Sequence, residues 1–285
     1  MAAGEIVRPE DLLKVPSWLE THPELRRRGI VLAAPLKPSY VYRTPFLEDP
    51  AYAVKILELE GEEAAIYERL RDDPRPENHT IPFELVHSER DLLIMPCLIH
   101  MDSLPFDTWP LSTFLALFLQ IVEGVEYLHN QRIAHLDLCH GNILVADERL
   151  ASFDKRLVPG RMYIIDYHTS RQLPSGPGVH PAIPLPPSQV RPPLATRLFD
   201  PYSWDVYCLG KFFERMIKLL YWDDPSPPWV ARRITRWLVG DERGCTNVCH
   251  CRPTARRARQ VLTVVYWAVR ASELFSKVAR FDICW

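Results

Sequence analysis

Three polar side chains near the middle of the chain are of the types that chemistry on a phosphate requires. Asp137 and Asn142 lie five positions apart in HLDLCHGN, after an apolar stretch, and Asp166 ends the apolar run YIID. A carboxylate can orient a hydroxyl and take its proton. An amide and a second carboxylate supply the oxygen ligands that Mg²⁺ prefers. In isolation Asp and Asn also favour loops, so the pattern around them decides the interpretation.

The segments around these residues change from strand-like to helical along the chain. The β-like runs are GIVLAA, SYVYRT, AYAVKILEL, FELVHS and DLLIMP, with a helix predicted over 62–70 between the third and the fourth. After Pro110, apolar residues from Phe114 to Leu128 recur at helical spacing, and further helices are predicted over 203–220 and 254–270. A strand-rich first third and a helix-rich remainder predict an α+β, two-lobed architecture.

The order H-x-D-L-x-x-x-N, followed by two apolar residues and Asp166, resembles the catalytic and metal-binding loops of protein kinases. Other stretches resemble that family in its own order: AVK at 53–55, Glu63 in EEAAIYERL, LLIMPCL at 92–98, DVYCLG at 205–210 and RPTA at 252–255. The resemblance covers nearly the whole chain and is most similar to the divergent kinase-like proteins common in fungi.

The resemblance implies a two-lobed protein kinase-like fold with a small β-rich N-lobe and a larger helical C-lobe. Residues 29–98 would form the N-lobe and hinge, and residues 99–270 the C-lobe. Residues 1–28 would be an N-terminal extension, and residues 271–285 a C-terminal tail.

The resemblance also assigns roles in binding ATP and Mg²⁺. Lys55 would hold the phosphates and be held in turn by Glu63, while Asp137 would orient the acceptor hydroxyl. Asn142 and Asp166 would bind Mg²⁺. The hinge residues Met95, Pro96 and Leu98 would line the adenine site; Pro96 lacks an N–H but keeps the carbonyl that an adenine amino group needs.

Several positions depart from the family pattern. No glycine occurs between Gly29 and Gly61, so a glycine-rich phosphate loop is missing and PLKPSYVYRT stands in its place. Leu136 replaces the arginine that normally receives an activation-loop phosphate. Tyr167 and His168 follow the metal-binding Asp166, and Arg252 loses its usual carboxylate partner. The long interval from 142 to 166 predicts an enlarged hairpin near 147–161.

Proline is concentrated in one segment, with eight prolines between 174 and 193. Proline at this density prevents a helix or a central strand, so an extended loop is predicted. The spacing Pro181-x-x-Pro184-x-x-Pro187 suits a polyproline II ligand, which makes 174–193 a candidate docking segment for a protein partner.

Composition excludes several broad classes. The chain has 285 residues, 47% hydrophobic and 25% charged, with a formal net charge of −2, which argues against a protein built to bind nucleic acid. No apolar run reaches the roughly 18 residues needed to span a bilayer. The N-terminus lacks a secretory signal pattern, and seven cysteines suggest reduced thiols. These features predict an intracellular, cytoplasmic protein with no membrane partner.

Three functions remain open from the sequence. The first is an ATP-dependent protein kinase of Ser/Thr type that transfers the γ-phosphate to a protein hydroxyl. The second is a pseudokinase that binds nucleotide or protein without turnover, because the phosphate loop is missing. The third is a small-molecule phosphotransferase, because HLDLCHGNIL followed by an aspartate also resembles aminoglycoside and choline kinases. DVYCLG and RPTA favour protein kinases over the third function.

Overall fold

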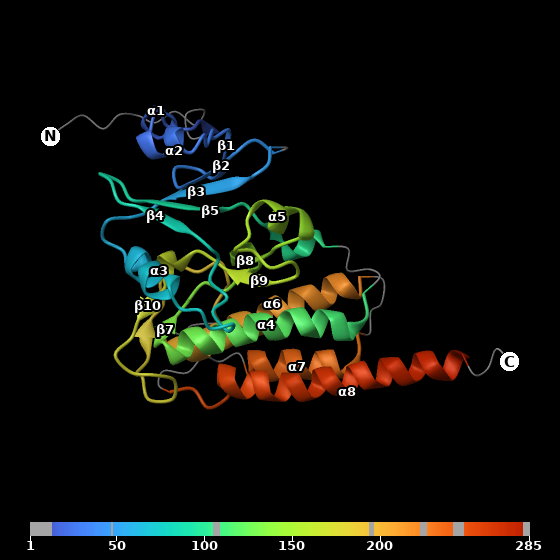
Figure 1. Ribbon diagram of the computed structural model, residues 1–285. Coiled ribbons are helices and arrows are strands. Elements are labelled where there is room, and N and C mark those ends of the chain that lie inside the picture. The colour runs from blue at the N-terminus through green and yellow to red at the C-terminus, as the bar shows by residue number, and fades with distance from the viewer. Residues whose placement is uncertain are drawn as a thin grey trace.

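The computed structural model describes residues 13–46, 48–104, 109–193, 197–222, 227–241 and 248–281. It is a mixed α/β structure in which a five-stranded sheet lies at one end and long helices lie at the other (Figure 1). The α+β content predicted from the sequence is therefore confirmed at this level.

The sheet is antiparallel and has the strand order β1-β2-β3-β5-β4. Four of the five predicted β-like runs contain β2 (Val41–Arg43), β3 (Tyr52–Ile56), β4 (Glu84–Val86) and β5 (Leu92–Pro96). The run GIVLAA was expected to be a strand, but β1 spans Ala34–Lys37 and begins only at its last residue. Ile30 and Leu32 are instead buried beside the preceding helices.

Two short helices that the sequence pattern did not indicate, α1 (Ser17–Glu20) and α2 (Pro23–Arg27), pack on this sheet. Leu19 and Leu25 are almost completely buried, in a cluster with Tyr42, Val54 and Ile94 of the sheet. These helices are too short to show helical periodicity in the sequence. The boundary between 28 and 29 stays a prediction.

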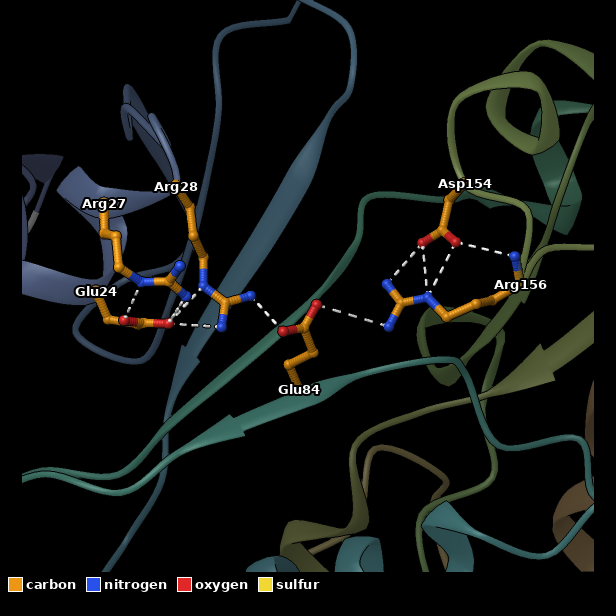
Figure 2. A network of polar contacts seen from close by, with 6 residues as sticks. All are labelled: Glu24, Arg27, Arg28, Glu84, Asp154 and Arg156. Atoms are coloured by element: carbon orange, nitrogen blue, oxygen red, sulfur yellow. Dashed lines mark hydrogen bonds and ion pairs between the residues drawn. The ribbon is translucent and has the colours of Figure 1, made fainter.

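A chain of ion pairs connects α2 to the sheet and then to a distant loop (Figure 2). Glu24 binds Arg27 and Arg28, at 2.6 Å each, and Arg28 also binds Glu84 of β4. Glu84 then lies 3.7 Å from Arg156, which binds Asp154 at 2.7 Å. The network joins three segments that are far apart in the sequence.

The loop at the end of this network belongs to the predicted enlarged hairpin, which the structure confirms. Strands β8 (Ile143–Val145) and β9 (Met162–Ile164) pair antiparallel, and the segment that connects them contains the helix α5 (Glu148–Phe153). Asp147 caps this helix by accepting a hydrogen bond from the Leu150 N–H at 2.7 Å. Strand β6 (Ile99–His100) pairs with the other edge of β8.

The helical part is built on α4 (Leu111–Asn130) and α6 (Pro201–Leu220). The predicted stripe of α4 is confirmed, since all its residues are buried except Leu117, which is half-buried. Phe118 of α4 packs against Phe213 of α6, with ring centroids 4.5 Å apart. The predicted helix at 62–70 is also present, as α3 (Glu63–Arg71).

Two helices complete this part. The predicted helices did not include α7 (Trp229–Val239), which is short and follows two prolines. The helix α8 (Ala255–Phe281) continues beyond residue 270, where the predicted helix ended. Gly210 of α6 lets α7 approach closely, because a β-carbon at Gly210 would lie 2.9 Å from the backbone nitrogen of Val239. The boundary at 270/271 stays a prediction.

The helix α4 is long and apolar enough to cross a bilayer by length and hydropathy, although charged and polar residues interrupt it. In the structure 61% of the most apolar 18-residue stretch of α4 is buried inside the protein. Core helices commonly have this pattern.

The remaining short strands form two pairs near the end of α4 and α6. β10 (Arg171–Gln172) pairs with β7 (Ile133–Ala134), and β11 (Ile183–Pro184) pairs with β12 (Leu198–Phe199). The second pair anchors the proline-rich segment, which is otherwise extended as predicted.

Candidate functional site

A cavity of about 880 Å³ brings the predicted site residues together. This is a typical volume for a small-molecule site, which is roughly 300–1,000 Å³. Its lining includes all of the predicted site residues except Glu63, namely Lys55, Met95, Pro96, Leu98, Asp137, Asn142 and Asp166. Glu63 lies behind Lys55 and contacts it.

Lys55 is paired with two carboxylates. Its Nζ donates to Glu63 Oε1 at 2.7 Å, and it also donates to Asp166 Oδ1. Burial alone would lower the pKa of the Lys55 ammonium, but the charges of Glu63 and Asp166 outweigh it and raise that pKa above the usual value. Lys55 is therefore a fixed positive charge on the cavity wall.

The pKa values of the two carboxyl groups shift in opposite directions from their usual values. Burial raises the pKa of Glu63, and Lys55 offsets only part of this effect. Burial would also raise the pKa of Asp166, but Lys55, with a further contribution from Lys37, holds it below the usual value. The lowered pKa keeps Asp166 ionised at neutral pH, and 21% of its side chain remains exposed toward the cavity.

A column of rings holds the segment that carries Asp166. Tyr167 is fully buried, with its ring 4.9 Å from that of Tyr67 on α3 and 5.3 Å from that of His135. Tyr67 in turn contacts Phe83 at 4.7 Å. Asp166 itself has a left-handed backbone, with φ of 65°. The rings on either side of Tyr167 hold this segment in place and so stabilise the strained backbone of Asp166.

Asp205 of α6 fixes the loop that carries Asp137. Its carboxylate is fully buried and accepts hydrogen bonds from the N–H groups of His135 and Leu136, both at 2.8 Å. His129 Nε2 lies 3.0 Å from the same carboxylate. Leu136 has a left-handed φ of 67°, so these charge-assisted bonds stabilise an unfavourable backbone conformation.

Asp137 and Asn142 are in contact. The Asn142 side-chain amide donates to the Asp137 carbonyl at 2.8 Å and to Asp137 Oδ2 at 3.2 Å. The amide nitrogen is thereby engaged, which leaves Asn142 Oδ1 as the atom that could bind a metal. Both side chains are buried apart from the cavity face.

The donor set suits a hard cation that keeps several ligands of its own. Asn142 and Asp166 both line the cavity and supply oxygen atoms. Within the described residues, no group of three or more His, Cys, Asp or Glu side chains could hold a metal ion. Mg²⁺ suits such a site, because it is usually held by one or two carboxylates together with phosphate and water oxygens.

Another part of the cavity lining is apolar. Val41 and Ala53 of the sheet and Leu144 of β8 line it beside Met95, Pro96 and Leu98. The Cys97 N–H is engaged, since it donates to the Ala51 carbonyl at 2.9 Å. A flat aromatic ligand fits a wall of this composition.

Sequence reasoning missed Lys37. This exposed residue at the end of β1 lines the cavity, and its charge lowers the pKa of Asp166. The turn after it places Ser39 at a left-handed φ of 67°, a conformation for which glycine is the usual residue. The signal in the sequence was a lysine inside the glycine-free segment PLKPSYVYRT.

Cys139, two positions after Asp137, and Arg252, which was expected to lose its carboxylate partner, have well-defined surroundings. Cys139 is buried, and burial together with the charge of Asp137 raises the pKa of its thiol to about 11, so this position is neutral. Arg252 lies over the ring of Tyr207 at 4.9 Å and donates to the Val239 carbonyl at 2.6 Å. Among the described residues its Nη2 atom has no hydrogen-bond partner.

Sequence reasoning also missed the position of Ser188 and Gln189. These residues of the proline-rich segment line the cavity and contact the carboxylate of Asp137. The contact joins positions 51 and 52 residues apart, so no local pattern could indicate it.

Comparison with known proteins gives one short match. A 45-residue segment is 40% identical to the human serine/threonine-protein kinase STK11, which corresponds to 16% of this chain and 10% of that protein. The chain therefore covers a tenth of the length of this relative. No protein-family model matches the chain. The short match is weak support for a kinase-like relationship.

Proposed function

We propose that this chain is an ATP-dependent phosphotransferase with a two-lobed protein kinase-like fold, and that it transfers the γ-phosphate of ATP to a Ser or Thr hydroxyl of a protein. One observation carries the proposal: Lys55 binds both Glu63 and Asp166, and Lys55 and Asp166 line the same cavity as Asp137 and Asn142. Phosphoryl transfer depends mainly on positioning and on charge neutralisation, which this arrangement supplies.

Each residue has a separate role in the proposed reaction. Lys55 neutralises phosphate charge, and Glu63 keeps its ammonium in place. Asp166 and Asn142 would hold Mg²⁺, which when bound neutralises the phosphate oxygens. Asp137 orients the acceptor hydroxyl and takes its proton. The apolar wall around Met95, Pro96 and Leu98 would bind adenine.

Lys37 supports the proposal because its charge can replace the phosphate contacts of the missing glycine-rich loop. Backbone N–H groups cannot approach phosphates closely without glycine, but a lysine side chain reaches them as a point charge. Lys37 lies on the cavity, where the sequence has no glycine between 29 and 61.

A thermal-unfolding experiment with ATP and Mg²⁺, separately and together, tests the proposal. Ligand at 100 times its dissociation constant stabilises the folded protein by about 2.7 kcal/mol. We expect stabilisation by ATP, a larger effect with Mg²⁺, and loss of the Mg²⁺ increment in Asp166→Asn. A midpoint that millimolar ATP with Mg²⁺ leaves unchanged refutes the proposal.

A second candidate function is a pseudokinase that binds nucleotide without turnover. The observation in its favour is that the chain's own Ser188 and Gln189 occupy the carboxylate of Asp137. Nucleotide binding is common to both functions, so the discriminating measurement is phosphate transfer. Asp137→Asn should abolish transfer and preserve nucleotide binding if the chain is an enzyme.

The partners and setting are part of the same proposal. Pro181, Pro184 and Pro187 are all exposed, which suits the docking of a protein through segment 174–193. We propose an intracellular, cytoplasmic setting with a protein substrate and without nucleic-acid or membrane partners.

A further inference from the structure

The carboxylate of Asp137 is enclosed by donors from the proline-rich segment. Ser188 Oγ donates to Asp137 Oδ1 at 2.9 Å, and the Gln189 N–H donates to the same oxygen at 2.7 Å. Gln189 Nε2 donates to Asp137 Oδ2 at 3.1 Å. With the 3.2 Å contact from Asn142, both carboxylate oxygens have partners. An external acceptor must displace some of these groups.

One of these donors is a hydroxyl in the position that an acceptor requires. A general base must lie within about 2.6–3.2 Å of the group whose proton it takes, and Ser188 Oγ meets this condition. Ser188 also lines the cavity that holds Lys55 and Asp166. We propose that Ser188 is an intramolecular phosphoryl acceptor, modified by this chain's own site. The inference rests on the proposed function.

The segment is held so that Ser188 stays near Asp137. Pro186 and Pro187 restrict the backbone directly before it. The Val190 N–H donates to Ser188 Oγ at 3.2 Å, and the Tyr207 hydroxyl donates to the Arg191 carbonyl at 3.2 Å. An acceptor held in this way pays little entropy on reaction, which is the main advantage of an intramolecular step.

The step is balanced as follows. Ser188 Oγ bonds to the γ-phosphorus of a nucleoside triphosphate, and the bond from that phosphorus to the β,γ-bridging oxygen breaks. The hydroxyl proton passes to the Asp137 carboxylate, and the nucleoside diphosphate leaves. The products are phosphoserine at position 188, the diphosphate and one proton, which Asp137 later releases to water.

The product cannot remain where Ser188 was. A phosphoserine carries a charge of about −1.5 to −2 at neutral pH, and it would lie against the carboxylate of Asp137. Leu136 provides no positive charge at this position, in contrast to the family's arginine. Repulsion therefore expels residues 185–193 from the site and opens Asp137 to other acceptors.

The first test is mass spectrometry of the full chain incubated with ATP and Mg²⁺. We expect one phosphoryl group per chain at Ser188, with a rate constant that does not change with protein concentration. Ser188→Ala and Asp137→Asn should remain unmodified, whereas the control Ser175→Ala, in the same segment, should be modified like the wild type. Modification whose rate rises in proportion to protein concentration overturns the intramolecular step.

The second test needs no nucleotide. Ser188→Asp places a negative charge against Asp137. Ser188→Ala removes the hydrogen bond to Asp137 and the one from the Val190 N–H, and it keeps both contacts from Gln189. Hydrogen exchange at the amide of Gln189, which is bonded to Asp137 and not to Ser188, should accelerate by at least tenfold in Ser188→Asp, and much less in Ser188→Ala. Equal protection in Ser188→Asp and the wild type contradicts the expulsion.

The two proposals fail in different ways. If ATP with Mg²⁺ does not stabilise the protein, the proposed function fails, and the modification of Ser188 fails with it. If ATP with Mg²⁺ stabilises the protein and Ser188 stays unmodified, the proposed nucleotide site stands, and the inference about Ser188 is wrong.

Discussion

Substitution of Asp205 by alanine tests how the site loop is held. The change removes the acceptor of two buried main-chain N–H groups, those of His135 and Leu136. Each hydrogen bond to a charged group contributes about 1.5–3 kcal/mol, so the pair contributes roughly 3–6 kcal/mol. Relaxation of the left-handed Leu136 returns about 1–2 kcal/mol. We expect a net loss of about 1–5 kcal/mol, which most domains survive at 25 °C.

Asp200→Ala is the matched control for this experiment. Asp200 is also a buried carboxylate of the same region, and it caps α6 by accepting from the N–H groups of Tyr202 and Ser203 at 3.0 and 3.1 Å. It also accepts from the Cys249 N–H at 2.9 Å. Its loss destabilises the same helix without removing a contact to the loop at 135–137.

The assay combines urea unfolding with hydrogen exchange. Both variants should lose stability, but only Asp205→Ala should accelerate exchange at the amides of His135 and Leu136 beyond the change in global stability. If the chain is an enzyme, Asp205→Ala should also lose more activity than Asp200→Ala. Equal protection of these two amides in both variants would refute the reasoning that Asp205 holds the loop.

Three further predictions follow from other parts of the structure. Lys37→Ala should weaken ATP binding in a salt-dependent way, because an exposed charge is screened, and Lys218→Ala, at an exposed site on α6, should not. Gly210→Ala should lower the midpoint of thermal unfolding, and Gly176→Ala should not. The new β-carbon at 210 would lie 2.9 Å from a backbone nitrogen of α7. Such overpacking costs about 1–3 kcal/mol, whereas the gain in helix propensity is roughly 1 kcal/mol. Hydrogen bonds from its two arginine partners lower the pKa of Glu24 from 4.5 to about 2, so the stability advantage of the wild type over Glu24→Gln should be present above pH 4.5 and disappear toward pH 2 in pH-dependent urea unfolding.

Elements with strong local patterns could be predicted from the sequence. The apolar stripe from Phe114 to Leu128 predicted which face of α4 is buried, because residues three and four positions apart lie on the same face of a helix. The placement of Asp137, Asn142 and Asp166 around one cavity agrees with the pattern of spacing that first singled them out. In these cases the local order of residues carries the structural information.

The missed features depend on contacts between distant segments. Lys37 resembles an ordinary solvated lysine until the turn at Ser39 and the cavity beneath it are known. The contact of Ser188 with Asp137 depends on how the proline-rich segment returns to the site. The helix α7 is a different case, because its buried residues Ala231, Ile234 and Leu238 do recur at helical spacing, so its sequence carried a local signal that the predicted helices left out.

The column of rings that holds Tyr167 also has a consequence for how the protein unfolds. It runs from Phe83 beside the sheet through Tyr67 and Tyr167 to His135, whose N–H is bonded to α6. Each aromatic contact contributes about 0.5–1.5 kcal/mol beyond the area it buries, and separating the sheet from the helices must break at least one of the three. Coupling of this size changes an equilibrium constant by roughly two- to tenfold. The sheet and the helices should therefore melt together, in one calorimetric transition rather than two.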